Sequence, residues 1–399
     1  MVVENAAAGM EKIVRDLQFY KFCAYGFLKN LRFFEPFLIL FFLEKDLTYL
    51  QIGTVYTIRE ITRNIFEIPA GILADVMGRK RTMMTSFGLY VMSFLLYYFS
   101  EGLLLIIIAT LFFALGDAFR TGTHKAMIFD YLDRKGWSGQ KVHYYGHTRS
   151  CSQLGSAVSS LLAAALVFFS GEYNAVFLYS AVPYLAGLIL IGTYPAYLDG
   201  QVSNGQGQSM GQRFRKVLHD FWMSFRKPAV LRGIINVSSF SGYYRAIKDY
   251  LQPVIAAFAL SIPLFTGLDD IRRTGVMVGI IYFIIYLLSS RVTRRSGQFA
   301  GMFRSTGRPL NMTLIGGLLV GAMSGLAYLA GLYWLAILLF VGIFLVENLR
   351  MPAGVSWFSE NVNREILATA LSAESQGKTV FTAVIAMGLG LAADRFNPG

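Results

Sequence analysis

The chain has 399 residues, of which 55% are hydrophobic and only 15% are charged, and it contains 33 Phe and 22 Tyr. This balance is too apolar for an ordinary soluble domain and predicts a protein embedded in a lipid bilayer. The formal net charge of +12 does not indicate nucleic acid as a partner, because the basic residues form short clusters between apolar runs, as they do in the cytoplasmic loops of membrane proteins.

Long apolar segments follow one another along the whole chain. A helix needs about 20 such residues to cross the roughly 30 Å hydrocarbon core of a bilayer. Eleven segments meet this requirement, with approximate limits of 17–43, 48–74, 82–100, 103–131, 142–170, 174–197, 230–260, 274–292, 309–329, 332–354 and 365–392. Residues 1–16 lack the pattern of a cleaved secretory signal, so we expect a cytoplasmic lead-in there.

The loops between these segments alternate in charge. If the N-terminus is cytoplasmic, the loops on its side carry about twenty basic residues, whereas the opposite loops carry only Lys45, Arg272, Arg273 and Arg395. This positive-inside bias predicts a cytoplasmic N-terminus. We expect an integral, multi-pass protein of a prokaryotic plasma membrane.

The longest hydrophilic connection, residues 199–228, begins as a Gly/Gln/Ser linker and becomes basic and amphipathic. Six predicted spans precede it and five follow. We therefore predict an N-terminal six-helix bundle at 1–198, a cytoplasmic linker at 199–228, and a second bundle at 229–399. The sequence ends where a twelfth span is expected, which favours a missing last helix over a true eleven-span protein.

A short charged hairpin, GILADVMGRKRT at residues 71–82, joins the second and third predicted spans. Gly71 and Gly78 allow close helix approach and the backbone angles of a tight turn. Asp75 can pair with Arg79 or face the N-terminus of a neighbouring helix. The same residues are also compatible with a simple positive-inside turn.

This hairpin resembles the signature of the loop between the second and third helices of the major facilitator superfamily. The matching residues are Gly71, Leu73, Ala74, Asp75, Gly78, Arg79, Lys80 and Arg81. The resemblance covers the whole predicted topology and implies an all-helical membrane transporter with two pseudo-symmetric six-helix bundles that rock about a central site. In that family the hairpin is a conformational latch, so the resemblance implies gating roles for Gly71, Asp75, Gly78 and Arg79.

Three features depart from the family's patterns. The equivalent hairpin of the second half, residues 300–309, has Arg304 where the aspartate would fall. The family's proton-coupled drug antiporters typically carry an arginine motif in the fourth span, where Arg120 is displaced, and a Gly-Pro pair in the fifth, where Gly155 has no proline. These departures weaken an assignment as a drug antiporter.

Charged residues are unevenly distributed among the predicted spans. Spans three, six and nine contain none, whereas spans one, two, four, seven and eleven contain nearly all of them. Such residues cost at least roughly 2.5–3.5 kcal/mol at mid-membrane, so they face the bundle interior, water or one another. In the resembled fold, helices one, four, seven and ten line the path, flanked by two, five, eight and eleven, in agreement with this distribution.

Helical spacing places several of these charges on common faces. The sets are Lys29, Arg32 and Glu35; Glu60, Arg63 and Glu67; Asp117, Arg120 and His124; and the pairs Arg245–Asp249 and Glu374–Lys378. For any single pair, a purely structural bond between helices explains the spacing equally well. The ensemble predicts a polar central cavity with excess positive charge, suited to an anionic or zwitterionic group.

Residues of this cavity divide into two groups by the chemistry of their side chains. The substrate-binding candidates are Arg32, Arg63, Arg120, His124, Tyr243, Tyr244, Arg245 and Lys248. The proton-coupling candidates are Glu35, Glu67, Asp117 and Glu374. Among the carboxylates, Asp117 and Glu35 are favoured because they lie mid-span in helices that are expected to line the cavity.

These observations predict a secondary active transporter that moves a small organic compound by alternating access, coupled to protons or another ion, and works as a monomer in the bilayer. Efflux is favoured because aromatic-rich spans suit amphipathic compounds. The alternatives are an uptake carrier for an anionic metabolite and a transporter-like receptor or scaffold without flux. No nucleophile–base or metal set indicates an enzyme, no cofactor is expected, and Cys23 and Cys151 lack the spacing of a zinc site.

Overall fold

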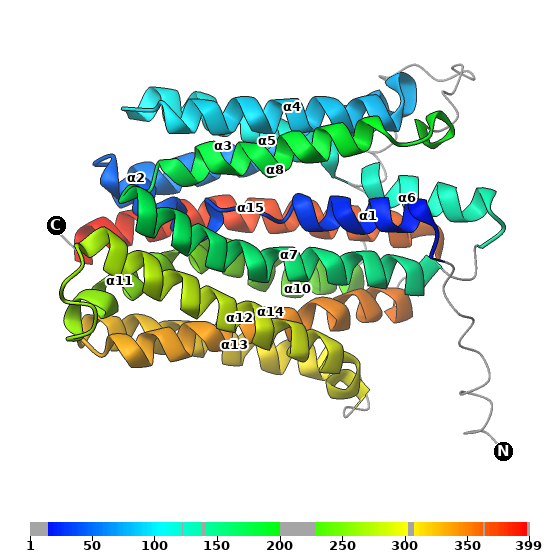
Figure 1. Ribbon diagram of the computed structural model, residues 1–399. Helices are drawn as coiled ribbons and strands as arrows, with labels where there is room; N and C mark the ends of the chain where they lie inside the picture. The colour runs from blue at the N-terminus through cyan, green and yellow to red at the C-terminus, as the bar shows by residue number, and fades with distance from the viewer. Residues whose placement is uncertain are drawn as a thin grey trace.

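A computed structural model describes residues 15–121, 123–137, 141–199, 228–301, 307–361 and 364–396, and every regular element within these ranges is a helix (Figure 1). We call the elements before residue 200 the N-terminal set. They are α1 (Leu17–Leu28), η2 (Glu35–Phe37), α2 (Leu38–Glu44), α3 (Tyr49–Met77), α4 (Arg79–Tyr98), α5 (Leu103–Arg120), α6 (Thr123–Arg134), α7 (Lys141–Ser170), α8 (Ala175–Gly192) and η4 (Ala196–Asp199).

The elements after residue 227 form the C-terminal set. They are α10 (Pro228–Ile247), η5 (Lys248–Tyr250), α11 (Leu251–Ser261), α12 (Asp270–Gly301), α13 (Gly307–Leu329), α14 (Tyr333–Asn361) and α15 (Arg364–Phe396). The linker predicted at 199–228 lies almost wholly outside the described residues. The predicted domain boundaries therefore stay predictions.

The long helices lie side by side, and the chain turns back at two opposite ends of the bundle (Figure 1). We name these ends after a residue in one turn of each. At the Gly78 end, α3 is followed by α4; at the Asp46 end, α2 is followed by α3. In Figure 1 the Asp46 end lies at the left, beside the C-terminus of the chain.

Seven segments of the described chain are long and apolar enough to cross a membrane. The predicted first span, 17–43, is instead divided into α1, η2 and α2, and the predicted seventh, 230–260, into α10, η5 and α11. One continuous helix is therefore the wrong expectation for these two spans. Each break lies close to a proline, Pro36 or Pro253, and proline has no N–H to continue a helical ladder. The total of eleven spans stays a prediction.

The two sets pack closely near the Asp46 end, where α3 lies along α15 and α7 along α12. Small residues permit this approach. A Cβ atom on Gly53 of α3 would lie 2.5 Å from the carbonyl oxygen of Ala386, and one on Gly279 of α12 would lie 2.3 Å from the Cβ of Ala164. Larger side chains at these glycines would push the two sets apart.

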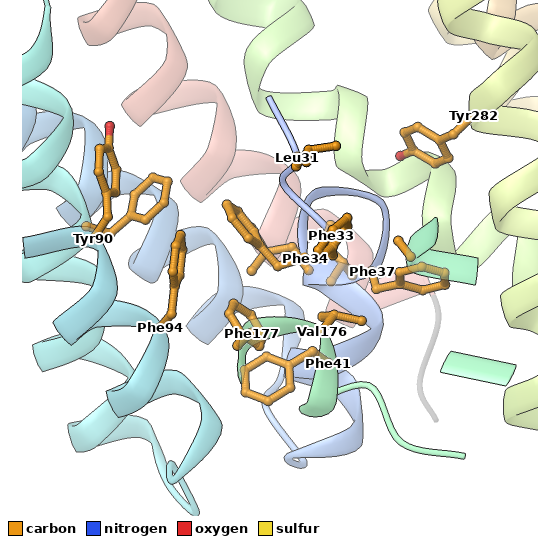
Figure 2. Close-up of a cluster of buried hydrophobic side chains, with 14 of the residues drawn as sticks. Leu31, Phe33, Phe34, Phe37, Phe41, Tyr90, Phe94, Val176, Phe177 and Tyr282 are labelled. Carbon is orange, nitrogen blue, oxygen red and sulfur yellow. The ribbon is translucent and has the colours of Figure 1, made fainter. Parts of the chain in front are cut away.

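Aromatic side chains fill the interior of the N-terminal set (Figure 2). Phe34 stacks on Phe177 with ring centroids 5.5 Å apart, and Phe177 also contacts Phe41 and Tyr97. These side chains are buried, and together they fix the short elements that follow the break in the first span. Much of the aromatic content thus stabilises packing.

Candidate substrate cavity and the contacts between the two sets

The break in the first span is closed by a side chain of the other set. In a continuous helix, the N–H of Ile39 would donate to the carbonyl of Glu35. Instead, the buried amide of Gln252 lies between them: its Oε1 accepts from Ile39 N at 2.7 Å and its Nε2 donates to Glu35 O at 2.9 Å. Glu35 precedes Pro36 and Gln252 precedes Pro253. These two hydrogen bonds therefore join the break in the first span to the break in the seventh span.

A cavity of about 310 Å³ lies beside these breaks and between the two sets. Six cationic side chains and five carboxylates line it. They are Arg32, Arg59, Arg63, Arg120, Arg245 and Lys248, and Glu35, Glu60, Glu67, Asp117 and Asp249. The sequence-based prediction of a charged cavity that gathers residues of the first, second, fourth and seventh spans agrees with this lining.

Asp117 of α5 is the carboxylate that joins the charged residues on the N-terminal side of the cavity. Arg120 contacts it at 3.0 Å, Arg32 lies 3.9 Å away, and the hydroxyl of Tyr90 donates a hydrogen bond to it. Arg120 and Arg32 are held further by the hydroxyls of Tyr90 and Tyr184, at 3.0 and 3.2 Å. The single carboxylate of Asp117 thus interacts with two arginines, which leaves a net positive charge on this wall.

Glu60 of α3 joins the two sets on the opposite wall. Its side chain lies 3.0 Å from Arg63 and 3.5 Å from Arg59 of its own helix, and 3.3 Å from Arg245 of α10. Arg63 also donates to Thr379 of α15 at 3.4 Å. Glu60 is buried, so a single desolvated carboxylate holds three guanidinium groups from two sets.

A second pair of contacts between the sets lies at the break in the seventh span. Lys248 Nζ donates to Glu35 at 2.8 Å and lies 3.2 Å from Asp249, while Asp249 accepts from the hydroxyl of Tyr56 at 2.7 Å. The predicted pairing of Arg245 with Asp249 within one helix is wrong. The reason is that α10 gives way to η5 at residue 248, which changes the spacing on which an i,i+4 pair depends.

Four predicted site residues lie away from this cavity. His124 lines a neighbouring cavity, where its ring stacks on Tyr25 at 3.7 Å. Tyr243 faces α13, because a Cβ on Gly321 would overlap its hydroxyl, and it lines an apolar groove formed by the C-terminal set together with Tyr49. Tyr244 packs edge-on against Phe344. Glu374 pairs with Lys378 at 3.0 Å as expected, outside the described lining of the central cavity.

The hairpin at residues 71–82 contains one glycine that the fold requires and one that it does not. Gly78 has φ +96°, and a Cβ there would lie 2.6 Å from a carboxylate oxygen of Asp199. That oxygen accepts from the N–H of Lys80 at 2.7 Å, at the start of α4. Among the described residues, no atom lies within 4 Å of the Cβ position of Gly71, so this part of the structure shows no close helix approach at Gly71.

The charged residues of the hairpin bond within the N-terminal set. Arg79 donates to the carbonyl of Ala126 at 3.5 Å and lies 4.0 Å from Asp130, both on α6. The side chain of Asp75 and the residue Arg304 of the second hairpin lie outside the described parts of the structure. The gating roles implied for this hairpin stay predictions.

Several residues of these networks are missing from the sequence-based prediction. Arg59 and Tyr56 belong to the contacts around the cavity: Arg59 lies beside the adjacent Glu60, a spacing that helical periodicity does not single out, and Tyr56 bonds to Asp249, 193 positions away. Asp199, which caps the hairpin, stands at the start of a predicted linker. Within the described ranges, no group of three or more His, Cys, Asp or Glu side chains could hold a metal ion.

Among characterised folds, the chain is similar to transporters. The nucleoside transporter NupG aligns with a TM-score of 0.74 at 12% identity, over 94% of this chain and 91% of that one. A bacterial homologue of the human lysosomal transporter Spinster, solved in an inward-facing and unoccupied conformation, aligns with a TM-score of 0.70 at 15% identity, over 96% of this chain and 84% of that one. Likeness at these identities shows the fold alone.

In sequence, the chain is similar to the uncharacterized MFS-type transporter YxaM of Bacillus subtilis (strain 168). The two are 24% identical over 243 residues, which are 61% of this chain and 59% of that protein. The family model described as Major Facilitator Superfamily matches residues 22–392. This match spans nearly the whole sequence, and the chain therefore belongs to the major facilitator superfamily of membrane transporters.

Proposed function

We propose that this protein is a secondary active transporter whose central cavity binds a small molecule carrying an anionic or zwitterionic group. The observation that carries the proposal is the lining of the 310 Å³ cavity, where six cationic side chains face five carboxylates at the junction of the two sets. Guanidinium groups bind carboxylates and phosphates with strong, directional hydrogen bonds. A substrate carboxylate would compete with Asp117 and Glu60 for the same arginines.

Alternating access is supported by the position of the contacts between the two sets. Among the described residues, the hydrogen bonds and ion pairs that join them involve residues 35–63, 168 and 173 of the N-terminal set. One example lies at the extreme Asp46 end, where Asp394 of α15 accepts from the N–H groups of Tyr49 and Leu50. We propose that this conformation is closed at the Asp46 end and receives substrate from the Gly78 end.

The Gly78 end is the cytoplasmic side by the predicted positive-inside orientation, so the proposed conformation faces inward. Efflux remains the predicted direction on the sequence, but the polar cavity and the buried aromatic cluster favour a charged metabolite over an amphipathic compound. We therefore place an anionic metabolite ahead of an amphipathic one as the substrate.

Proton coupling is assigned to Glu67 in this proposal. Asp117 is held by two arginines and Glu35 by Lys248, and a carboxylate in such a pair keeps its charge. Glu67 lines the cavity and, within the described part of the chain, forms no ion pair. A carboxylate without a partner in the membrane interior binds a proton more readily than a paired one.

The test is substrate-dependent proton movement in sealed proteoliposomes that contain an internal pH dye. A panel of anionic, zwitterionic, cationic and neutral compounds is added to the wild type, Glu67→Gln and Asp117→Asn. We expect proton flux with anionic or zwitterionic compounds, a loss of that flux in Glu67→Gln with substrate binding retained, and anion binding that is retained or tighter in Asp117→Asn, because the competing carboxylate is gone. Flux with cationic compounds alone, or unchanged proton flux in Glu67→Gln, would overturn the corresponding assignment.

A further inference from the structure

A second cavity, of about 360 Å³, lies within the N-terminal set, bounded by α1, α7 and the junction of α5 and α6. It is separate from the central cavity but shares one residue with it, because Arg120 lines both. Its lining comes from the C-terminal half of α1 and the two residues that follow it, which precede Arg32 of the central cavity, and from the half of α7 that is nearer the Gly78 end. The cavity therefore lies between the central cavity and the end from which we propose that substrate enters.

The charge of this second cavity has one sign. Lys29, Arg120, Lys125 and Arg149 line it, and no carboxylate is among its described lining residues. In the central cavity every arginine lies near an acid, whereas Lys29 and Arg149 form no ion pair within the described ranges. Lys29 is half-buried, just beyond the end of α1. An unpaired cation in such a position is costly unless an anion compensates it.

The walls of the second cavity are held in place before any ligand arrives. The amide of Asn30 donates to Ser152 O at 2.6 Å and to the hydroxyl of Ser156 at 3.1 Å. Close packing of α1 on α7 supports these bonds, because a Cβ on Gly26 or on Gly155 would lie within 3 Å of the facing helix. A rigid cavity lined by charged and polar groups loses little entropy when it binds a ligand.

We infer that this second cavity is a binding site for an oxyanion, the phosphate or carboxylate group of a small molecule or of a lipid head group, held by Lys29 and Arg149. Lysine ammonium and arginine guanidinium groups both form charge-assisted hydrogen bonds to such oxygens. Because Arg120 faces both cavities, an anionic group bound here lies one residue from the central site. In transport, this site would hold the substrate before it enters the central cavity. That role rests on the proposed transport function, whereas the binding of the oxyanion does not.

The inference is tested by calorimetric titration of the full-length protein in a neutral detergent. The probes are inorganic phosphate, pyrophosphate and citrate, each at constant ionic strength set with chloride. The variants are Lys29→Gln and Arg149→Gln in the second cavity, with Lys248→Gln in the central cavity as the matched loss of one cation. Arg149 is exposed, so its substitution leaves the packing of the helices unchanged.

We expect at least one probe to bind the wild type, with its Kd raised about tenfold or more in Lys29→Gln and in Arg149→Gln. A tenfold change corresponds to about 1.4 kcal/mol. Lys248→Gln should leave this binding event unchanged. Absence of binding for all three probes, or equal affinity in the wild type and Arg149→Gln, would overturn the inference.

The source of the oxyanion is decided by repeating the titration in nanodiscs. Discs of pure phosphatidylcholine are compared with discs that contain phosphatidylglycerol, which carries an anionic phosphate. Competition by phosphatidylglycerol supports the site and assigns it to a lipid head group, whereas retained binding supports it and assigns it to a soluble anion. Failure of transport with intact, Arg149-dependent binding would refute the proposed function and leave the oxyanion site standing.

Discussion

Glu60 lies against arginines of two helices, and the effect of neutralising it can be argued from these contacts alone. Glu60→Gln leaves Arg59, Arg63 and Arg245 without their shared carboxylate. Loss of one partner of a buried ion pair costs roughly 3–5 kcal/mol, and the partial exposure of these arginine side chains reduces this to about 1–3 kcal/mol. We expect a lower midpoint of thermal unfolding in detergent.

The matched control for this prediction is Glu67→Gln, since Glu67 lines the same cavity on the same helix without an ion pair in the described structure. Its unfolding midpoint should stay close to that of the wild type. A double-mutant cycle of Glu60→Gln with Arg245→Gln should give a coupling of about 0.5–3 kcal/mol. Zero coupling would mean that this pair does not hold the two sets together.

Gly78 and Gly71 offer a matched comparison within the hairpin element. Gly78→Ala places a Cβ at φ +96° and against the carboxylate of Asp199, so we expect a loss of about 1–3 kcal/mol in stability. Gly71→Ala meets no atom of the described residues and replaces a helix-interior glycine, so stability should be unchanged or higher by about 1 kcal/mol. Thermal unfolding of both variants checks this order, and equal midpoints would contradict the requirement for glycine at position 78.

The break in the first span is held by Gln252, and removing that amide should loosen it. In Gln252→Leu, the N–H of Ile39 loses its acceptor and the carbonyl of Glu35 its donor. We expect faster hydrogen–deuterium exchange in the peptide that contains Ile39 and a stability loss of about 1–3 kcal/mol. Gln153→Leu, in the second cavity, is the control and should leave that exchange rate unchanged.

Retained protection at Ile39 in Gln252→Leu would have a definite meaning. The N–H of Ile39 would then have bonded directly to the carbonyl of Glu35, as in a continuous helix. In that case the amide of Gln252 would not be needed to stabilise the broken span.

Helical segments and the gathering of charges could be predicted from the sequence because they depend on local information. Apolar length gives the spans, and spacing gave the pairs Glu60–Arg63, Asp117–Arg120 and Glu374–Lys378, which the structure contains. The breaks could have been suspected from Pro36 and Pro253, at similar depths in the first and seventh spans. Each proline disfavours helix at the residue before it.

Contacts across the two sets could not be predicted, because no periodicity links residues that are so far apart in the sequence. Glu60 meets Arg245 across 185 positions, and Glu35 meets Lys248 across 213. Which cation faces which acid depends on the mutual rotation and depth of α3, η2 and α10. Side chains such as Tyr243 likewise point toward α13 for reasons of packing that a single sequence does not contain.

At the scale of the whole molecule, alternating access predicts opposite movements at the two ends. Spin labels at Glu101 and Ala330 report the distance between the sets at the Asp46 end, and labels at Lys135 and Arg308 report it at the Gly78 end. All four positions are exposed. On adding a transported substrate, the first distance should increase and the second decrease, because the sets rock as rigid bodies.

The control pair for this measurement lies within one set, at Glu101 and Glu172, and its distance should stay constant. Cys23 and Cys151 are first replaced by serine so that only the introduced cysteines carry a label. Movement of both inter-set distances in the same direction would contradict rocking about a central site and indicate a general loosening of the protein.

The bond between Ile39 and Gln252 also orders events during synthesis on the ribosome. The two residues are 213 positions apart, and chains grow at about 5–20 residues per second, so the amide that completes the first span is made roughly 10–40 seconds after the backbone it serves. During that interval the nascent first span either forms an uninterrupted helix or leaves two peptide groups without partners. The backbone hydrogen bonds of the first span are therefore completed only after the C-terminal set has been synthesised.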